Sequence, residues 1–126
     1  LENRALIMTG EYRLKILHTP GHTSGSICLY EPFQHFLFSG DTVVKGEYLT
    51  PMLESGSAGD FVNSVERLLT MKINIMYPGH GEESTDPEAD MRWAIEAARQ
   101  RMREYQERQG VGSKRRIQVR AETEEE

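Results

Sequence analysis

Three short glycine-containing runs in this chain each carry a side chain that can bind a metal ion. The runs are TPGHTSG around His22, SGDT around Asp41 and PGHG around His80. Two imidazoles and one carboxylate are the nitrogen and oxygen ligands that zinc and similar divalent cations accept. The three runs therefore predict a metal site assembled from turns that lie far apart in the sequence.

Each run follows a segment with the character of a β-strand. Residues 12–18 alternate between apolar and polar side chains, and they end just before the first run. Residues 27–30 and 35–39 are two short apolar segments joined by a proline-containing turn, which predicts a hairpin whose second strand leads to the aspartate. Residues 73–77 form a further predicted strand, which Pro78 ends. Strand ends followed by glycine turns would fix the direction of each donor.

Two helices are expected to cover this sheet. The first is capped by Ser57 or Asp60 and ends near Met71, and its apolar side chains recur with helical spacing at Phe61, Val65, Leu68 and Leu69. The second begins after Thr85 or Asp86, with Pro87 in its first turn. Its apolar stripe comprises Met91, Ile95, Ala98, Met102 and Tyr105. We expect both stripes to serve packing.

The order and wording of the three runs resemble the second half of the metallo-β-lactamase superfamily, with its TPGHTxGS, GD and PGHG motifs. The resemblance runs from residue 6 to residue 80. It implies an α/β fold that is half of an αββα sandwich, with one mixed sheet and helices on one face. It also implies that His22 and His80 are ligands of different metal ions, and that Asp41 bridges the ions and is the catalytic residue.

The resemblance implies a metal-dependent hydrolase acting on a small ester, thioester or lactone. Zinc is the implied cofactor, with iron or manganese as alternatives. Thr23 or Ser39 would orient the metal ligands by hydrogen bonds, and Gly81 would leave room for substrate beside His80. The other two histidines have local roles in this interpretation: His18 packs or forms a hydrogen bond nearby, and His35 is a solvated loop residue.

The family's first-half motif, HxHxDH, is absent from this sequence, which contains four histidines. The chain begins at Leu1 rather than methionine, and we expect a fragment or a processed product. Whether it is an enzyme by itself stays open, and the alternative is a non-catalytic remnant or assembly module. We expect a homodimer, or pairing with a complementary N-terminal half, through an uncovered apolar sheet face built by Leu14, Ile16, Ile27, Leu29, Leu37 and Phe38.

Length and composition set the remaining expectations. Of the 126 residues, we assign 1–110 to the half-domain and 111–126 to a polar, mobile tail. The net charge of -5 argues against a nucleic-acid partner, and no apolar run approaches the ~20 residues of a membrane span. Cys28 is the single cysteine and is expected to be buried, which favours a reducing compartment, the cytoplasm.

Overall fold

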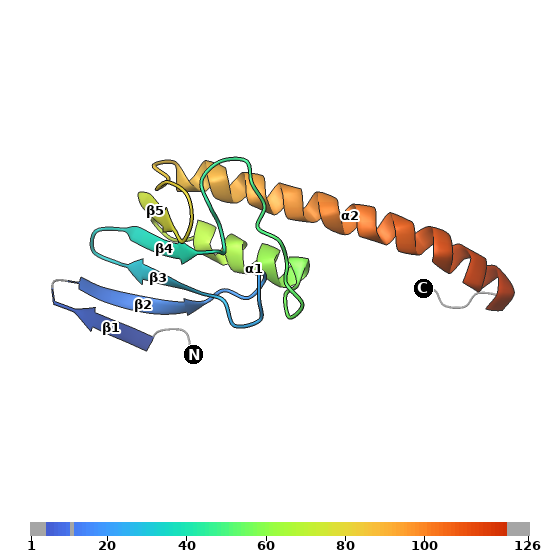
Figure 1. Cartoon of the computed structure of the whole chain (residues 1–126), viewed down its shortest axis with the longest axis horizontal. Helices are drawn as coiled ribbons and strands as arrows, with labels where there is room; N and C mark the ends of the chain where they lie inside the picture. Colours follow the sequence, from blue (N-terminus) through green and yellow to red (C-terminus); the bar gives the residue numbers. More distant parts are fainter. Residues whose placement is uncertain (1–4, 11, 121–126) are drawn as a thin grey trace.

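The structure, a computed structural model, describes residues 5–10 and 12–120, and within them a single five-stranded mixed sheet. The strands are β1 (Ala5–Thr9), β2 (Tyr12–His18), β3 (Ile27–Glu31), β4 (Phe36–Gly40) and β5 (Ile75–Pro78). They lie in sequence order across the sheet, with β1 to β4 antiparallel and β5 parallel to β4 (Figure 1). The predicted mixed sheet is confirmed, and β1 is a strand that the sequence pattern did not predict.

Helix α1 (Ala58–Leu69) forms the crossover between the parallel strands β4 and β5. Ser57 caps it, because its side chain accepts a hydrogen bond of 3.1 Å from the backbone N–H of Asp60. Parallel strands end at the same edge of a sheet, so the residues after β4 and after β5 lie side by side. This edge carries Asp41 and His80.

Helix α2 (Pro87–Arg120) begins where the sequence predicted. Asp86 caps it by accepting a hydrogen bond of 3.3 Å from the N–H of Ala89. The helix continues past Gly110 into the segment assigned to the polar tail and projects beyond the sheet (Figure 1). Residues 121–126 lie outside the described residues, and the mobility of the segment 111–126 stays a prediction.

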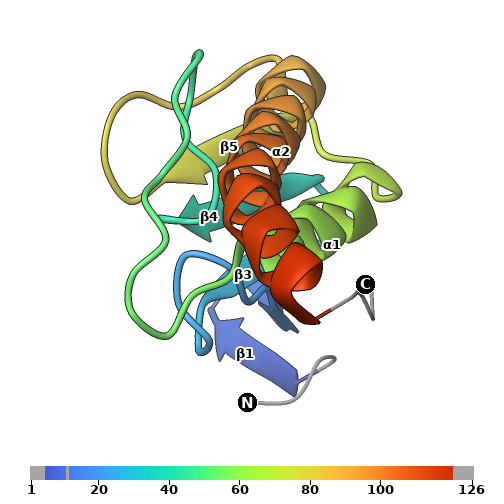
Figure 2. The same ribbon diagram turned by 90° about the vertical axis from the view of Figure 1, so that its right-hand side faces the viewer.

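Both helices cover one face of the sheet, as Figure 2 shows from the end of the molecule. Across the strands, Tyr30, Leu37 and Met76 are neighbours on this face. Together with Cys28 they form a buried cluster with the apolar faces of the helices, which contribute Phe61, Val62, Val65, Leu68, Met91, Ala94, Ile95 and Ala98. The predicted stripes of α1 and α2 therefore serve packing, except that Tyr105 is 57% exposed beyond the core.

The opposite face of the sheet carries Ile16, Leu29, Phe38 and Tyr77 in register across four strands. Four aromatic rings form edge or tilted contacts on it, with centroids 5.4 to 5.8 Å apart: Tyr12, Phe36, Phe38 and Tyr77. Phe38 is 39% exposed. No helix covers this face in the part of the chain that the structure describes (Figure 1).

One residue, Leu37, differs from its predicted place in this face. Leu37 lies on the helix side and is fully buried, because neighbouring residues of a strand point to opposite faces and Phe38 occupies the open one. Leu14 and Ile16 do lie on the open face, yet each is only 6% exposed. Among the side chains of this face whose exposure is described, Phe38 of β4 is the large apolar one with more than a third of its surface exposed.

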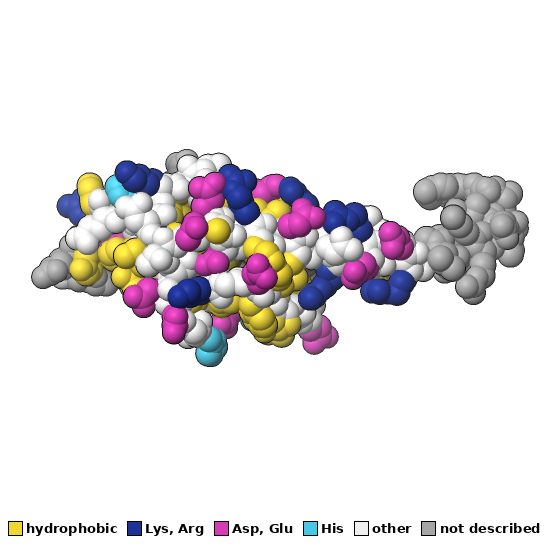
Figure 3. All heavy atoms as spheres, turned by 90° about the horizontal axis from the view of Figure 1, so that it is seen from above, with side chains coloured by type: hydrophobic (Ala, Val, Ile, Leu, Met, Phe, Trp, Pro, Cys, Tyr) yellow, Lys and Arg dark blue, Asp and Glu magenta, His cyan; other side chains and the backbone are white. Residues whose placement is uncertain are grey.

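The outer surface of α2 mixes acidic and basic side chains, which are interspersed along it in Figure 3. Arg92 pairs with Glu88, Arg103 with Glu96, and Arg99 reaches Glu66 of α1. None of the described helices combines the length and the apolar character needed to cross a membrane.

Candidate metal-binding site

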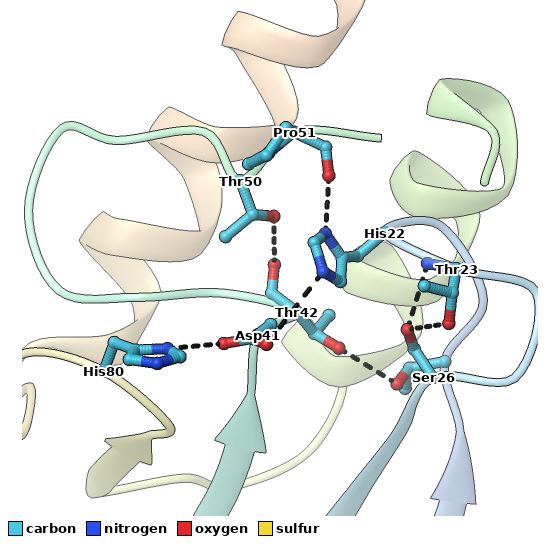
Figure 4. Close-up of polar contacts among 9 residues, drawn as sticks. His22, Thr23, Ser26, Asp41, Thr42, Thr50, Pro51 and His80 are labelled. Carbon is cyan, nitrogen blue, oxygen red and sulfur yellow. Dashed lines mark hydrogen bonds and ion pairs between the residues drawn. The ribbon is translucent and has the colours of Figure 1, made fainter. Parts of the chain in front are cut away.

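The structure brings the three predicted donors together at one edge of the sheet (Figure 4). Nε2 of His22 lies 4.0 Å from Oδ2 of Asp41, and Nδ1 of His80 lies 2.9 Å from Oδ1 of the same carboxylate. His22 comes from the loop after β2, Asp41 from the turn after β4 and His80 from the turn after β5. Asp41 therefore lies between the two imidazoles.

The loop that carries His22 packs against α1 through a glycine. A Cβ at position 21 would lie 2.6 Å from the Cα of Phe61, so only glycine permits this approach. The loop closes on itself where Thr23 donates its N–H to the Ser26 hydroxyl at 3.1 Å, and the Thr23 and Ser26 hydroxyls are 2.9 Å apart. Ser64 of α1 donates its hydroxyl to the Pro20 carbonyl at 2.7 Å. The helix thus fixes the position of the loop.

The segment 42–57 is hydrogen-bonded to the loop that carries His22, and we call this contact the clasp. Leu53 donates its N–H to the His22 carbonyl at 2.9 Å, and Ser57 donates its N–H to the Gly21 carbonyl at 2.8 Å. Gly56 makes this contact possible, since a Cβ there would lie 2.2 Å from the Gly21 oxygen. The sequence pattern predicts no place for this segment, which forms one wall of the site.

The orientation of the His22 ring is set by a main-chain carbonyl. Nδ1 lies 2.5 Å from the carbonyl oxygen of Pro51. Because a carbonyl oxygen only accepts, Nδ1 carries a hydrogen, and in the neutral ring Nε2 then keeps its lone pair. That lone pair is on the side of Asp41, and the ring is 15% exposed. This is the tautomer that a metal-binding histidine needs.

Asp41 and His80 are joined through the main chain that precedes them. Gly79 donates its N–H to the Gly40 carbonyl at 2.8 Å, which adds one more bond beyond the parallel strands. Gly40 has a φ of 55°, in the left-handed region that glycine adopts readily. A Cβ at position 79 would lie 3.4 Å from Oδ1 of Asp41. The carboxylate therefore stands close beside the turn that carries His80.

Exposure increases from His22 to His80. The side chain of Asp41 is 45% exposed and that of His80 is 85% exposed. Gly81 follows with a φ of 86° and open space where a Cβ would be. His80 is thus the outermost donor, and its ring contacts Asp41 from the solvent side.

A pocket of about 460 Å³ opens over these donors. Val44, Tyr48 and Pro51 give it an apolar wall, and Lys45 is the one cationic side chain among its described lining residues. Lys45 lies 3.0 Å from Glu82, and the hydrogen bond and charge of that carboxylate raise the pKa of Lys45. The pocket combines the three predicted donors at its floor, an apolar wall and a positive charge at its edge.

The donor set fits a divalent ion such as zinc, although the geometry is not closed around one. Among the described residues, no three His, Cys, Asp or Glu side chains are arranged to hold an ion. His22 presents the correct nitrogen toward Asp41, whereas His80 points Nδ1 at Asp41 itself. Since zinc binds nitrogen and oxygen at about 2.0–2.2 Å, His22 and Asp41 could reach a common ion. The assignment of all three as ligands stays a prediction.

The proposed supporting residues act differently from the prediction. Ser39 donates its hydroxyl to the Val43 carbonyl at 2.7 Å, and Thr23 bonds to Ser26, so both shape turns and neither contacts a donor side chain. His18 forms the expected local hydrogen bond, with Nε2 2.8 Å from the Ser24 carbonyl. His35 lies half-buried beside the β3–β4 hairpin and contacts no donor.

The Pro51 carbonyl was missed at the sequence level. Every residue has a main-chain carbonyl, so residue type gives no indication of its role. A further link was also missed: the buried hydroxyls of Thr19 and Thr42 are 3.3 Å apart and join the first motif to the second. Both threonines belong to the motif runs, and this position in the sequence was the one indication that they support the site.

Comparison with known proteins identifies relatives of this arrangement. The family model described as metallo-beta-lactamase superfamily matches residues 1–80. The human acyl-coenzyme A thioesterase MBLAC2 is 36% identical over 84 residues, which cover 64% of this chain and 30% of the relative. The chain thus spans about a third of the length of the curated relatives it matches.

Solved structures show the same fold. A metallo-beta-lactamase family protein from Thermus thermophilus superposes with a TM-score of 0.71 at 22% identity, covering 82% of this chain and 36% of that one. The protein TTHA1623, solved in a di-iron-bound form, gives a TM-score of 0.57 at 27% identity, covering 77% of this chain and 44% of that one. With the family model matching residues 1–80, this chain belongs to the metallo-β-lactamase superfamily.

Proposed function

We propose that this chain supplies the C-terminal part of a metal-dependent hydrolase that cleaves a thioester or a related small carbonyl substrate, such as an ester or lactone. The observation that carries the proposal is the meeting of His22, Asp41 and His80 at the floor of one pocket. The orientation of His22 by Pro51 supports it further, since this tautomer has its ligand nitrogen ready.

A bound zinc ion, or iron or manganese in its place, would supply Lewis-acid activation of the carbonyl and of the attacking water. His22 and His80 would each hold a metal ion through a neutral nitrogen. Asp41 would bind through one or both carboxylate oxygens and would also be the group that orients the attacking water. Thr19 and Thr42 stand behind the turns and keep the two motif runs in place.

The pocket favours a substrate that is both apolar and anionic. Val44, Tyr48 and Pro51 would contact an acyl group beside the reacting carbonyl, and the ammonium of Lys45, which pairs with Glu82 in the free chain, would exchange that partner for a carboxylate or phosphate of the substrate. A coenzyme A thioester has both features, and the relative MBLAC2 is named as an acyl-coenzyme A thioesterase. We therefore propose thioesters as the preferred substrate class, ahead of esters and lactones.

A metal-loading assay tests the proposal. The chain, loaded in turn with zinc, iron and manganese, is assayed with acyl thioesters, alone and mixed with a separately expressed first-half segment containing HxHxDH. Hydrolysis should require metal, disappear with a chelator and fall at least about 100-fold in Asp41→Asn, in the range of single catalytic-group losses. His35→Asn is the control, because asparagine tolerates the φ of 64° at this position. Absence of hydrolysis in every combination would refute the proposal.

The alternative, an assembly role, is favoured by one observation, the partly exposed aromatic group on the open sheet face. We propose that this face pairs either with a complementary N-terminal half or with a second copy of the chain. Activity that appears only with the first-half segment would support the first form of pairing.

The buried thiol of Cys28 supports placing the protein in the reducing cytoplasm.

A further inference from the structure

Asp90 contacts both loops that flank the pocket. It lies in the first turn of α2 and is half-buried. Its Oδ1 accepts a hydrogen bond of 2.9 Å from the N–H of Gly46, and its Oδ2 accepts one from the Ser84 hydroxyl. One carboxylate on the helix therefore joins the segment after Asp41 to the segment after His80.

The Ser84 contact fixes the segment that contains His80. Ser84 is 1% exposed, and it exchanges two backbone hydrogen bonds with Met76 of β5, at 2.9 and 2.7 Å. At the other end of the segment, Gly79 is bonded to the Gly40 carbonyl. The exposed residues 80–83 are thus held at both ends, by the bonds of Gly79 and of Ser84. Asp90 stabilises the Ser84 end.

The Gly46 contact fixes the wall opposite. Gly46 has a φ of 89°, and its carbonyl accepts a hydrogen bond of 3.0 Å from the N–H of Tyr48. Lys45, the preceding residue, pairs with Glu82 across the mouth of the pocket. Gly46, which Asp90 binds, therefore lies between Lys45, the charged side chain of this wall, and Tyr48, its aromatic side chain.

Glu88 provides an internal comparison. It lies in the same first turn and carries the same charge, so a general electrostatic effect at the helix N-terminus would apply to both residues. Glu88 instead pairs with Arg92 at 2.8 Å along the helix surface. The bonds of Asp90 to two separate loops are specific to its position.

We propose that Asp90 is a positioning residue that holds Lys45 and Tyr48 across the pocket from His80. This inference rests on the proposed function for its effect on substrate, whereas the positioning itself is a property of the free chain. Two independent measurements therefore test it.

Amide hydrogen exchange measured by NMR on the full chain tests the positioning. In Asp90→Ala, the Gly46 amide should exchange at least about tenfold faster, since its acceptor is lost. Asp90→Asn keeps one oxygen that can accept this bond and should restore most of the protection. Glu88→Ala is the matched control and should leave Gly46 unchanged. Faster exchange confined to the first turn of α2 would show that Asp90 only stabilises the helix end, and would overturn the proposal.

Ser84→Ala removes the hydroxyl that binds Asp90 and the Asp86 N–H but leaves the Gly46 bond in place, and it serves if Asp90→Ala fails to fold. Exchange should then increase at Ser84 and Met76, whose N–H groups are bonded to each other's carbonyls, while Gly46 stays protected, and equal loosening at Gly46 would contradict the model. With a thioester substrate, Asp90→Ala should raise KM about tenfold, against no change in Glu88→Ala. If the wild-type chain hydrolyses no substrate in any of the combinations above, including the mixture with the first-half segment, the proposed function fails while the exchange data still decide the role of Asp90.

Discussion

The ring of His22 takes its orientation from the carbonyl oxygen of Pro51, 2.5 Å from its Nδ1. These two residues belong to different loops, one after β2 and one after β4. The donor nitrogen of the first loop is therefore presented correctly only while the second loop is in place. Metal affinity and the packing of the two loops should accordingly change together.

Zinc affinity should depend on His22 and be independent of the histidine at the hairpin. His22→Ala removes an imidazole that the Pro51 carbonyl orients and whose Nε2 faces Asp41, and it should weaken zinc binding by about tenfold or more. His35→Asn should leave the affinity unchanged, because His35 contacts no donor. Calorimetric titration of the two variants measures both. Equal affinity in His22→Ala and wild type would remove His22 from the site.

Gly56→Ala should loosen the clasp between the two loops. The added Cβ would meet the Gly21 and His22 carbonyl oxygens at 2.2 and 2.5 Å, so the main chain must shift. We expect the free energy of unfolding to fall by about 1–3 kcal/mol and zinc affinity to fall by about 10–100-fold. Gly25→Ala is the control, since nothing lies within 4 Å of a Cβ there. Chemical denaturation and zinc titration give the two values, and matching results for the two variants would contradict the clasp.

Phe38→Lys should reduce self-association if a second copy covers the open sheet face. A charge at this partly exposed ring would be buried in such an interface without a partner, which is unfavourable. Phe33→Lys is the control, because Phe33 is 70% exposed at the hairpin and makes no contact in the aromatic group. Sedimentation equilibrium measures the dimer dissociation constant. A wild-type chain that stays monomeric at all concentrations would exclude pairing with itself.

The thiol of Cys28 should make stability fall at high pH. Burial raises the pKa of this thiol above its ordinary value of 9.0. Above that pH the unfolded chain releases the proton while the folded chain retains it, so unfolding becomes more favourable as pH rises, by up to about 1.4 kcal/mol per pH unit. Below pH 9 the effect is absent.

Cys28→Ala isolates this contribution, because alanine does not titrate. The difference in unfolding free energy between wild type and the variant should be constant up to about pH 8 and should shift against wild type from pH 9 upward. Urea denaturation across this range measures it. Parallel pH profiles for the two proteins would show that the thiol titrates alike in both states.

Much of this fold could be predicted because its strands carry clear patterns. The alternation of residues 12–18 matches the bounds of β2, and the capping residues Ser57 and Asp86 marked the starts of both helices. β1 was missed because Leu6, Ile7 and Met8 are apolar in succession and show no alternation. Leu37 was assigned to the wrong face for the same reason, since it stands between Phe36 and Phe38 and both faces of β4 are therefore apolar.

The site was predictable in its residues and not in its arrangement. His22, Asp41 and His80 were identified from glycine-rich turns at strand ends, and the structure brings them together. The clasp of residues 42–57, the Pro51 carbonyl and the double contact of Asp90 depend on main-chain groups or on long-range folding. Such contacts leave no trace in residue type.

The bond between the Gly79 N–H and the Gly40 carbonyl has one last consequence. It sets the separation of positions 41 and 80 through atoms that every sequence shares, whichever side chains stand there. Exchanging either side chain for a softer or harder donor would alter the preference for one ion over another while its attachment point stays fixed. In the proposed metal site, the donor side chains could therefore be exchanged one residue at a time on a main chain that stays in place.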